Sequence, residues 1–367
     1  MSPIASMEKG GKKMERKGIK MMPFFVLVVL QILVVLPPLY AASDKKPPKA
    51  VELSIHSFAF GSSAYVVCQG LADLINKHST LLKASSIETK GTITNAQTLA
   101  AHPEMRKNTL IYTVLAAQQW AKRGEEPFKK PYTSLRVVAN FQWVQDAYVT
   151  FNKDIKVFGD LAGKRFAVGP PGAGSSRYAI ARLQHGWGIL DKVKVEYMGF
   201  EASKDALIDR RIDGGFMGIV SIGDKWAPSP SAIELLSQPR PLYFISDTEE
   251  ALKRAKEKTG WPIYYGVMPA GTLGPKQPEP YIYVTQYVYF AADAEMDDQV
   301  VNEICRIFWE YSDEFKNYHK GGEGITKPTM AKVPITREDF HPAALKFYQS
   351  KGIEIGLEGW PEFKKFK

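Results

Sequence analysis

The glycine- and serine-rich segment Gly172–Ser176 has the residue types that bind an anion. It follows the apolar stretch 164–168, which predicts a buried strand, and it precedes an apolar helical pattern that begins at Ala179. We expect Ser175 to cap this helix, so that its free N–H groups and the positive end of its dipole face the loop. Such a helix end suits a carboxylate or a phosphate. An ordinary capped helix in an α/β domain would leave the same pattern, and the rest of the chain has to decide.

The segment does not form the phosphate-binding loop of nucleotide hydrolases. Gly169 and Gly174 have the G-x-x-x-x-G spacing of that motif, but Ser175 stands where the motif has its lysine, so no side chain reaches the outer phosphates. Pro170 and Pro171 also remove two backbone N–H donors that a phosphate cradle would use.

Residue types that perform catalysis are present but are not arranged for it. The six histidines show no H-E-x-x-H pattern and no paired His/Cys spacing, so no metal site is predicted. The chain has no G-x-S-x-G elbow of a hydrolase. His56 and Ser57 are neighbours at a strand end, where adjacent side chains point to opposite faces, and they make a poor base and nucleophile. We therefore expect a binding protein without a cofactor, and not an enzyme.

The N-terminal segment has the layout of a secretory signal. Residues 1–20 are basic, and Met21–Leu36 is almost entirely apolar. We expect cleavage near Ala41 or Ala42, which makes residues 1–42 a signal peptide and the remainder an exported protein. Retention of the segment as a membrane anchor stays open, because the residues two places before these alanines are not small.

The composition of the remaining chain is that of a mildly basic globular protein. Residues 1–42 hold six basic and two acidic residues, so the rest carries a net charge of about +5. These charges are dispersed, which argues against nucleic acid as a partner. Cys68 and Cys305 lie in apolar helical patterns, where buried free thiols are expected, although the compartment would permit a disulfide.

Hydrophobic periodicity predicts two α/β halves joined by long strands. In the first half we expect strands at 51–55, 84–89, 110–114, 135–139 and 146–151, and helices at 65–77 and from Thr92 or Thr94, either of which could be its cap. In the second half we expect strands at 164–168, 193–197, 212–218 and 242–246, and helices after Ser175 and at 202–210 and 229–236. An irregular crossing at 260–280, a long strand at 281–291 and helices at 297–318 and 342–350 complete the chain. We expect residues 43–150 plus 270–367 to form one lobe and 151–269 the other, with a ligand cleft between them.

Several segments together resemble the TAXI solute receptors of TRAP transporters in order and spacing. They include LSIHSFAFGSSAYVVCQGLADLINK, TKGTITNAQTLA, FGDLAGKRFAVGPPGAGSS and YMGFEASKDALIDRRIDGGF, and the resemblance covers nearly the whole chain after the signal segment. It implies a type II periplasmic binding protein (Venus flytrap) fold, a small carboxylate ligand held between the lobes, and delivery to a TRAP-type membrane permease by a monomeric receptor. An extracytoplasmic sensor that reports a ligand to a membrane kinase, or a secreted enzyme, could use the same fold.

The resemblance also implies which residues line the cleft. The candidate ligand-binding residues are Ser57, Phe58, Phe60, Ser62, Tyr65, Thr92, Asn95, Val114, Leu115, Gly172, Ala173, Gly174, Ser175, Ser176, Arg177, Phe216 and Met217. Phe58 and Phe60 replace small residues of the family's first loop, and Val114 and Leu115 replace polar ones. These departures predict a carboxylate with an apolar or aromatic body. Arg177 could pair with the carboxylate, or it could be a solvated residue of the first helical turn.

Overall fold

The computed structural model describes residues 49–222, 225–353 and 355. The chain divides into Met1–Pro47 and Pro48–Lys367, and the second unit holds all the described residues. The predicted signal peptide, residues 1–42, therefore lies outside the described residues. Among the described residues, no helix is long and apolar enough to cross a membrane, and no group of three or more His, Cys, Asp or Glu side chains could hold a metal ion.

In the described part of the chain, the central element of the fold is a nine-stranded sheet. Seven of its strands follow the order β2-β1-β3-β11-β4-β7-β8, and the other two, β10 and β9, pair with β11 and β4 respectively. β1 pairs in parallel with both β2 and β3, whereas β11 runs antiparallel to β3 and β4. The strands span Val51–His56 (β1), Leu82–Ile87 (β2), Thr109–Val114 (β3), Leu135–Thr150 (β4), Gly215–Ile222 (β7), Lys225–Pro228 (β8), Tyr243–Phe244 (β9), Tyr264–Met268 (β10) and Tyr281–Asp293 (β11).

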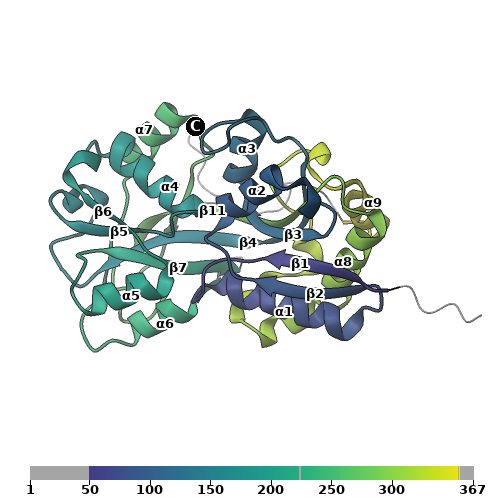
Figure 1. Cartoon of the computed structure of the whole chain (residues 1–367). Coiled ribbons are helices and arrows are strands. Elements are labelled where there is room, and N and C mark those ends of the chain that lie inside the picture. The colour runs from purple at the N-terminus through teal and green to yellow at the C-terminus, as the bar shows by residue number, and fades with distance from the viewer. Residues whose placement is uncertain (1–48, 223–224, 354, 356–367) are drawn as a thin grey trace, which may run out of the picture. The chain divides into compact units, whose positions relative to one another are not determined.

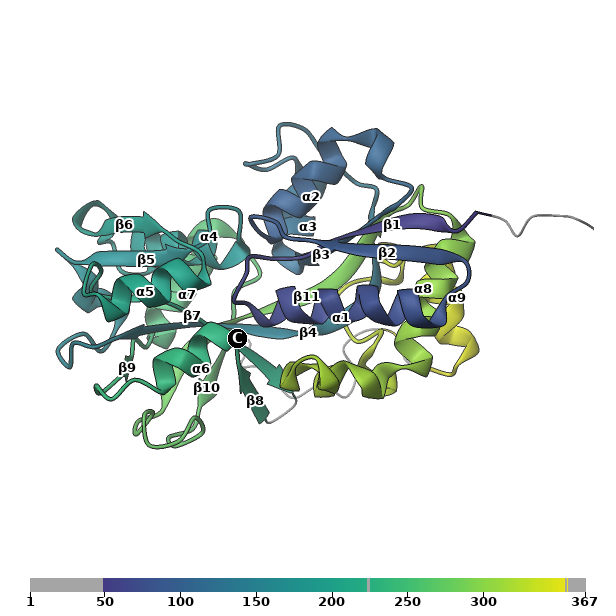
Figure 2. The same ribbon diagram turned by 60° about the horizontal axis from the view of Figure 1, so that its bottom comes forward.

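The first group of elements, here called lobe 1, contains β1, β2 and β3 with helices on both faces. α2 and α3 lie on one face of these strands, and α1 lies on the opposite face, next to α8 (Figures 1 and 2). The helices of lobe 1 span Ser63–His78 (α1), Thr92–Ala101 (α2), Leu115–Arg123 (α3), Asp298–Glu310 (α8) and Pro342–Ser350 (α9).

The second group, here called lobe 2, is built around a separate two-stranded parallel sheet of β5 (Arg165–Gly169) and β6 (Lys194–Tyr197). Figure 1 shows α4, α5, α6 and α7 around these strands and around β7. Its helices span Gly174–Ala181 (α4), Phe200–Ile208 (α5), Pro230–Leu236 (α6) and Glu249–Thr259 (α7). Short 3-10 helices occupy Pro103–Met105, Phe158–Leu161, Leu190–Lys192, Ser312–Asn317, Lys320–Gly324, Lys327–Thr329 and Arg337–Asp339, and a π-helical turn occupies Arg182–Gly186.

Two long strands join the lobes. β4 pairs with β11 from Leu135 to Asp146 and with β7 from Trp143 to Val149. β11 in turn pairs with β3 of lobe 1 near its C-terminal end. The fold is therefore the two-lobed α/β architecture that the sequence predicts, and its connection consists of continuous strands.

The structure corrects several predicted elements. Leu135–Thr150 forms one strand, β4, where the sequence predicts two, because Asn140 and Gln142 continue the ladder with β11 on either side of a register shift. β10 lies inside the predicted irregular crossing at 260–280, and α3, α7 and β8 were not predicted. The predicted helix 297–318 ends as α8 at Glu310 and continues as a 3-10 helix.

Both cysteines are buried free thiols, Cys68 on α1 and Cys305 on α8. Burial raises the pKa of the Cys305 thiol to about 12 and that of Cys68 further. We expect neither thiol to react with a maleimide in the native protein, and both to react once the chain is unfolded in urea. Mass spectrometry of the labelled protein checks this, and rapid labelling of the native state would contradict the burial of these residues.

Candidate functional site

A small cavity lies where the N-terminal end of α4 meets lobe 1. Its volume is about 30 Å³, close to the space that one water molecule occupies in the liquid. It is lined by Phe58, Thr92, Tyr112, Val114, Val144, Gly174, Ser175, Phe200, Phe216, Gln286 and Val288. These residues come from both lobes and from the two strands that join them, and none of their side chains is charged.

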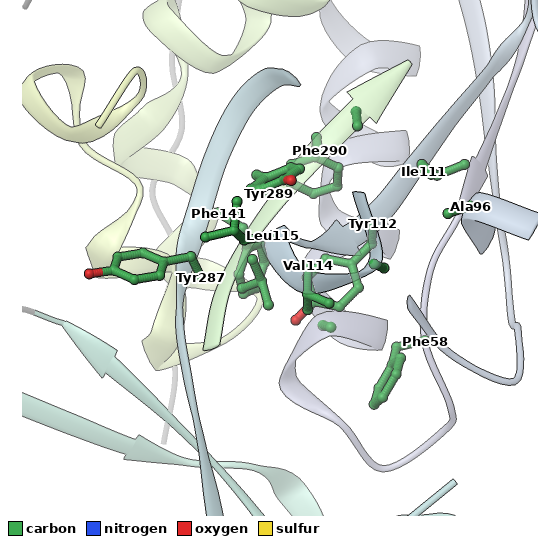
Figure 3. Packing of buried hydrophobic residues seen from close by; sticks show 14 of the residues in the cluster. Phe58, Ala96, Ile111, Tyr112, Val114, Leu115, Phe141, Tyr287, Tyr289 and Phe290 are labelled. Atoms are coloured by element: carbon green, nitrogen blue, oxygen red, sulfur yellow. The ribbon is translucent and has the colours of Figure 1, made fainter. Parts of the chain in front are cut away.

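Aromatic rings form much of the wall. Phe58 of the first loop makes edge-to-face contacts with Tyr112 of β3 at 5.9 Å and with Phe200 of α5 at 5.6 Å between ring centroids. Phe200 also packs against Phe216 of β7 at 5.0 Å. Figure 3 shows Phe58, Tyr112 and Val114 close together, next to the core residues of β11. Phe58 thus bridges the lobes, because Phe200 and Phe216 belong to lobe 2.

The start of α4 contacts lobe 1 directly. The Gly174 N–H donates to Thr92 Oγ1 at 3.1 Å, and the Ile93 N–H donates to the Gly172 carbonyl at 2.9 Å. The capping role predicted for Ser175 is wrong, because Ala173 occupies the N-cap position and no side chain caps the helix. Ser175 instead lies in the first turn of α4 and lines the cavity.

The predicted threonine cap of α2 is also wrong. Gly91 is the N-cap residue, with a φ of 142° that favours glycine. Thr92 lines the cavity, whereas Asn95 is fully buried and holds two loops in place. Its Nδ2 donates to the carbonyls of Ser57 and Tyr112, at 2.8 and 2.7 Å. Asn95 therefore positions the strand ends that carry the cavity wall.

The first loop divides into a buried and an exposed part. Ser57 is buried and donates its hydroxyl to the Ile87 carbonyl at 2.7 Å, and Ser62 caps α1 by accepting from the Tyr65 N–H. Phe60 is 57 % exposed and packs its ring against Tyr65, outside the cavity. Both Phe58 and Phe60 were predicted to line the ligand site, but only Phe58 lines the cavity.

Arg177 also lies outside the cavity. Its guanidinium stacks over the rings of Trp120 and Trp261, at 4.4 and 4.8 Å from their centroids, and lies 3.6 Å from a Glu125 oxygen. The geometry is that of a cation held by aromatic rings and a carboxylate. The structure therefore places Arg177 outside the cavity lining, and its pairing with a ligand carboxylate stays a prediction.

The other predicted residues surround the cavity without all lining it. Gly172 and Ala173 form the turn before α4, Ser176 donates its hydroxyl to the Pro170 carbonyl, and Met217 is buried in a separate apolar cluster of lobe 2. Leu115 lines a neighbouring cavity of about 10 Å³ and a larger one of about 360 Å³. The larger cavity is bounded by α3 and residues 334–339 alone, so it gathers none of the other predicted site residues.

Sequence reasoning missed Gln286 of β11, whose Nε2 donates to Asp146 Oδ1 of β4 at 2.7 Å. The sequence does contain an indication of this role, because Gln286 is the only amide in the run YIYVTQYVYFA. A polar side chain in a strand that is buried on both faces must find a hydrogen-bond partner. Tyr112, Val144, Phe200 and Val288 of the cavity wall were missed as well. They are apolar residues of regular elements, indistinguishable in sequence from ordinary core.

Behind the cavity lies a buried charge cluster formed by Asp146, Arg182 and Asp247. Arg182 Nη1 donates to Asp247 Oδ2 at 2.8 Å, and Trp187 Nε1 donates to Asp247 Oδ1 at 3.2 Å. Asp146 Oδ2 lies 3.9 Å from Arg182 Nη2, too far for a hydrogen bond. Burial raises the pKa of Asp146 to about 7, and the Arg182 charge opposes this rise.

No curated protein sequence is significantly similar to this chain. Solved structures with a remote likeness include the aliphatic sulphonate binding protein SsuA from Escherichia coli (14 % identity, 72 % of each chain covered, TM-score 0.41) and Rpa4515 of R. palustris with adipate (13 % identity, 71 % of this chain and 83 % of that one, TM-score 0.44). The model of the NMT1-like family matches residues 58–352, and the chain therefore belongs to the NMT1-like family.

Proposed function

We propose that the protein is a solute-binding receptor that captures a small organic anion between its lobes and delivers it to a TRAP-type transporter in the membrane. The observation that carries the proposal is the cavity at the start of α4, whose wall combines residues of both lobes and of the joining strands. The family, the two-lobed fold and the resemblance to TAXI receptors support it. In this proposal residues 1–42 direct export to the periplasm, and the lobes comprise 43–150 plus 270–367 and 151–269.

The proposed ligand is a carboxylate with an apolar or aromatic body. The first turn of α4 offers backbone N–H groups and the positive end of a helix dipole, which attract an anion. The remaining wall, with the rings of Phe58, Phe200 and Phe216, would bury an apolar body at about 25 cal/mol per Å². A second carboxylate would face these rings without a partner, at a cost of roughly 1–3 kcal/mol or more.

Ligand entry requires a change of conformation. A cavity of about 30 Å³ is too small for a ring and a carboxylate, so the lobes must separate or the aromatic side chains must change rotamer. The long strands β4 and β11 are the elements through which the lobes could move relative to each other.

Calorimetry across a matched ligand series tests the proposal. We expect aromatic and branched monocarboxylates to bind at least about tenfold tighter than glutamate or 2-oxoglutarate, a gap of roughly 1.4 kcal/mol. The ligand should be recovered unchanged after prolonged incubation, because the hydroxyl groups that line the described cavity have no basic side chain beside them in its lining. Equal or tighter binding of the dicarboxylates would contradict the ligand class, and accumulation of a product would contradict the receptor function.

A further inference from the structure

A buried amide oxygen without a partner borders the cavity. Gln286 is 6 % exposed, and its Oε1 has no hydrogen-bond partner among the described residues. Its Nε2 is engaged by Asp146 Oδ1, so the orientation of the amide is fixed from behind. Buried acceptors in proteins are almost always paired. An unpaired one in the wall of a binding cavity marks the place of a donor that the ligand supplies.

This oxygen lies beside the start of α4. A methyl group placed on Gly174 would lie 2.5 Å from Gln286 Oε1. Ser175, the next residue of α4, belongs to the same cavity wall. A carboxylate bound at this helix end would therefore have the Gln286 oxygen as its neighbour. Two acceptors repel each other unless a hydrogen atom lies between them, so the neighbouring ligand group must be a donor.

We propose that Gln286 selects carboxylates that carry a hydroxyl group on the adjacent carbon, and that Asp146 is a positioning residue that turns the Gln286 oxygen toward the ligand. The inference rests on the proposed function, because it assumes an anion at the start of α4. It adds a specificity-determining residue and a narrower ligand class, the 2-hydroxy acids with an apolar or aromatic body.

The charge of Asp146 decides which face of the amide the ligand meets. An ionised carboxylate can only accept, so it binds Gln286 Nε2 and leaves Oε1 to the cavity. A protonated Asp146 can donate to Oε1, and the amide then presents its NH₂ group to the ligand. In that state the site favours an acceptor, such as the oxygen of a 2-oxo acid, over a hydroxyl donor.

The surroundings of Asp146 allow this change near neutral pH. Burial raises its pKa to about 7, which places both protonation states within reach of ordinary buffers. The groups that face Asp146 are Gln286 on β11, Arg182 after α4, Asp247 after β9, and the phenols of Tyr112, Tyr148 and Tyr178. Burial raises the pKa of each phenol well above its ordinary value, so these phenols stay neutral. Burial raises the pKa of Asp247 as well, but Asp146 is the carboxyl group that is hydrogen-bonded to Gln286.

Three probes that differ at one carbon test the inference by calorimetry on the wild-type protein: phenylacetate, mandelate and benzoylformate. Their carboxylates are ionised at pH 5.5 and at pH 8.5 alike. At pH 8.5 we expect mandelate to bind at least about tenfold tighter than the other two. At pH 5.5 we expect benzoylformate to gain at least about tenfold relative to mandelate.

Two variants test whether Gln286 and Asp146 cause these differences in affinity. Gln286→Met keeps the length of the side chain without its oxygen, and it should bind mandelate and phenylacetate with affinities within about threefold of each other. Asp146→Asn cannot ionise, and it should abolish the pH dependence of the ratio between benzoylformate and mandelate. Gln238→Met, at the end of α6 and outside the cavity, is the matched control and should bind as the wild type does. Thermal unfolding of each variant verifies that it is folded.

The outcomes separate the two proposals. Equal affinities for mandelate and phenylacetate in the wild type overturn the inference and leave the carboxylate receptor intact. Unchanged discrimination in folded Gln286→Met overturns the role of Gln286. Binding of none of the three acids overturns the proposed ligand class, and the inference falls with it.

Discussion

Replacement of Arg182 by methionine is expected to lower the free energy of unfolding by about 3–5 kcal/mol. The Arg182 side chain is 1 % exposed and provides the cation for the carboxylates of Asp247 and Asp146. Its guanidinium also lies over the rings of Phe158 and Tyr148, at 4.4 and 5.0 Å. Methionine preserves much of the packing but leaves two acidic groups buried without a cation. Urea denaturation followed by circular dichroism measures the loss.

A matched arginine provides the control. Arg211 and its partner Asp209 are each 58 % exposed, so Arg211→Met should cost less than about 1 kcal/mol. A similar cost for both substitutions would show that the buried cluster has no special weight in the stability of the fold.

The stability of the Arg182→Met variant should depend on pH. In the wild type the folded-state pKa of Asp146 is about 7, above its ordinary value of 3.8, so the folded chain binds more protons than the unfolded chain between these values. The contribution of Asp146 to stability is therefore fully present below about pH 4 and is lost as pH rises through 7. Without Arg182 both carboxyl groups should take up protons more readily, so we expect the variant to lose less stability at pH 5 than at pH 8.

Substitution of Gly172 by valine is expected to prevent the lobes from closing around a ligand. A Cβ atom at Gly172 would meet the Thr94 hydroxyl and lie 3.1 Å from the Lys90 carbonyl oxygen, and both residues belong to lobe 1. The Thr94 side chain could rotate away, but the backbone of Lys90 could not. We expect ligand affinity to fall at least about tenfold, while the stability of the chain changes by less than about 1 kcal/mol.

Small-angle scattering distinguishes closure from simple loss of contacts. The radius of gyration of the wild type should decrease on saturation with the tightest acid of the series, and that of Gly172→Val should not. Gly199→Val is the matched control, because a Cβ atom there meets no other atom within 4 Å. A wild type whose radius stays the same with ligand would contradict closure, and a Gly172→Val protein that compacts normally would contradict the role of Gly172.

Local patterns along the chain were sufficient to predict the parts of the site that are local in sequence. The stretch from β5 to α4 was predicted from an apolar run, a proline-glycine turn and a helical pattern, and these depend on residues within about fifteen positions of one another. Gly174 and Ser175 of the cavity wall were predicted for this reason, whereas Phe58, Thr92, Val114 and Phe216 were predicted through the family resemblance. Helix boundaries were less predictable, because the N-cap residues Ala173 and Gly91 make no side-chain cap hydrogen bond that a sequence pattern could reveal.

Tertiary structure decided which of several chemically similar residues serve the site. Phe58 and Phe60 are equivalent in sequence, but the loop turns only Phe58 toward Tyr112 and Phe200. The guanidinium of Arg177 could bind a carboxylate, but it stacks on Trp120 and Trp261 outside the cavity.

The buried polar network depended most on the tertiary structure. Asp146, Arg182, Asp247 and Gln286 are far apart in the chain and meet because β4 and β11 pair in one particular register and α4 ends over them. The sequence alone thus determined the element types, the two-lobed α/β class and the glycine-rich turn, since these follow from periodicity and backbone preferences. Which side chains share the cavity was decided only by the pairing of distant strands, because register and long-range packing leave no local pattern to read.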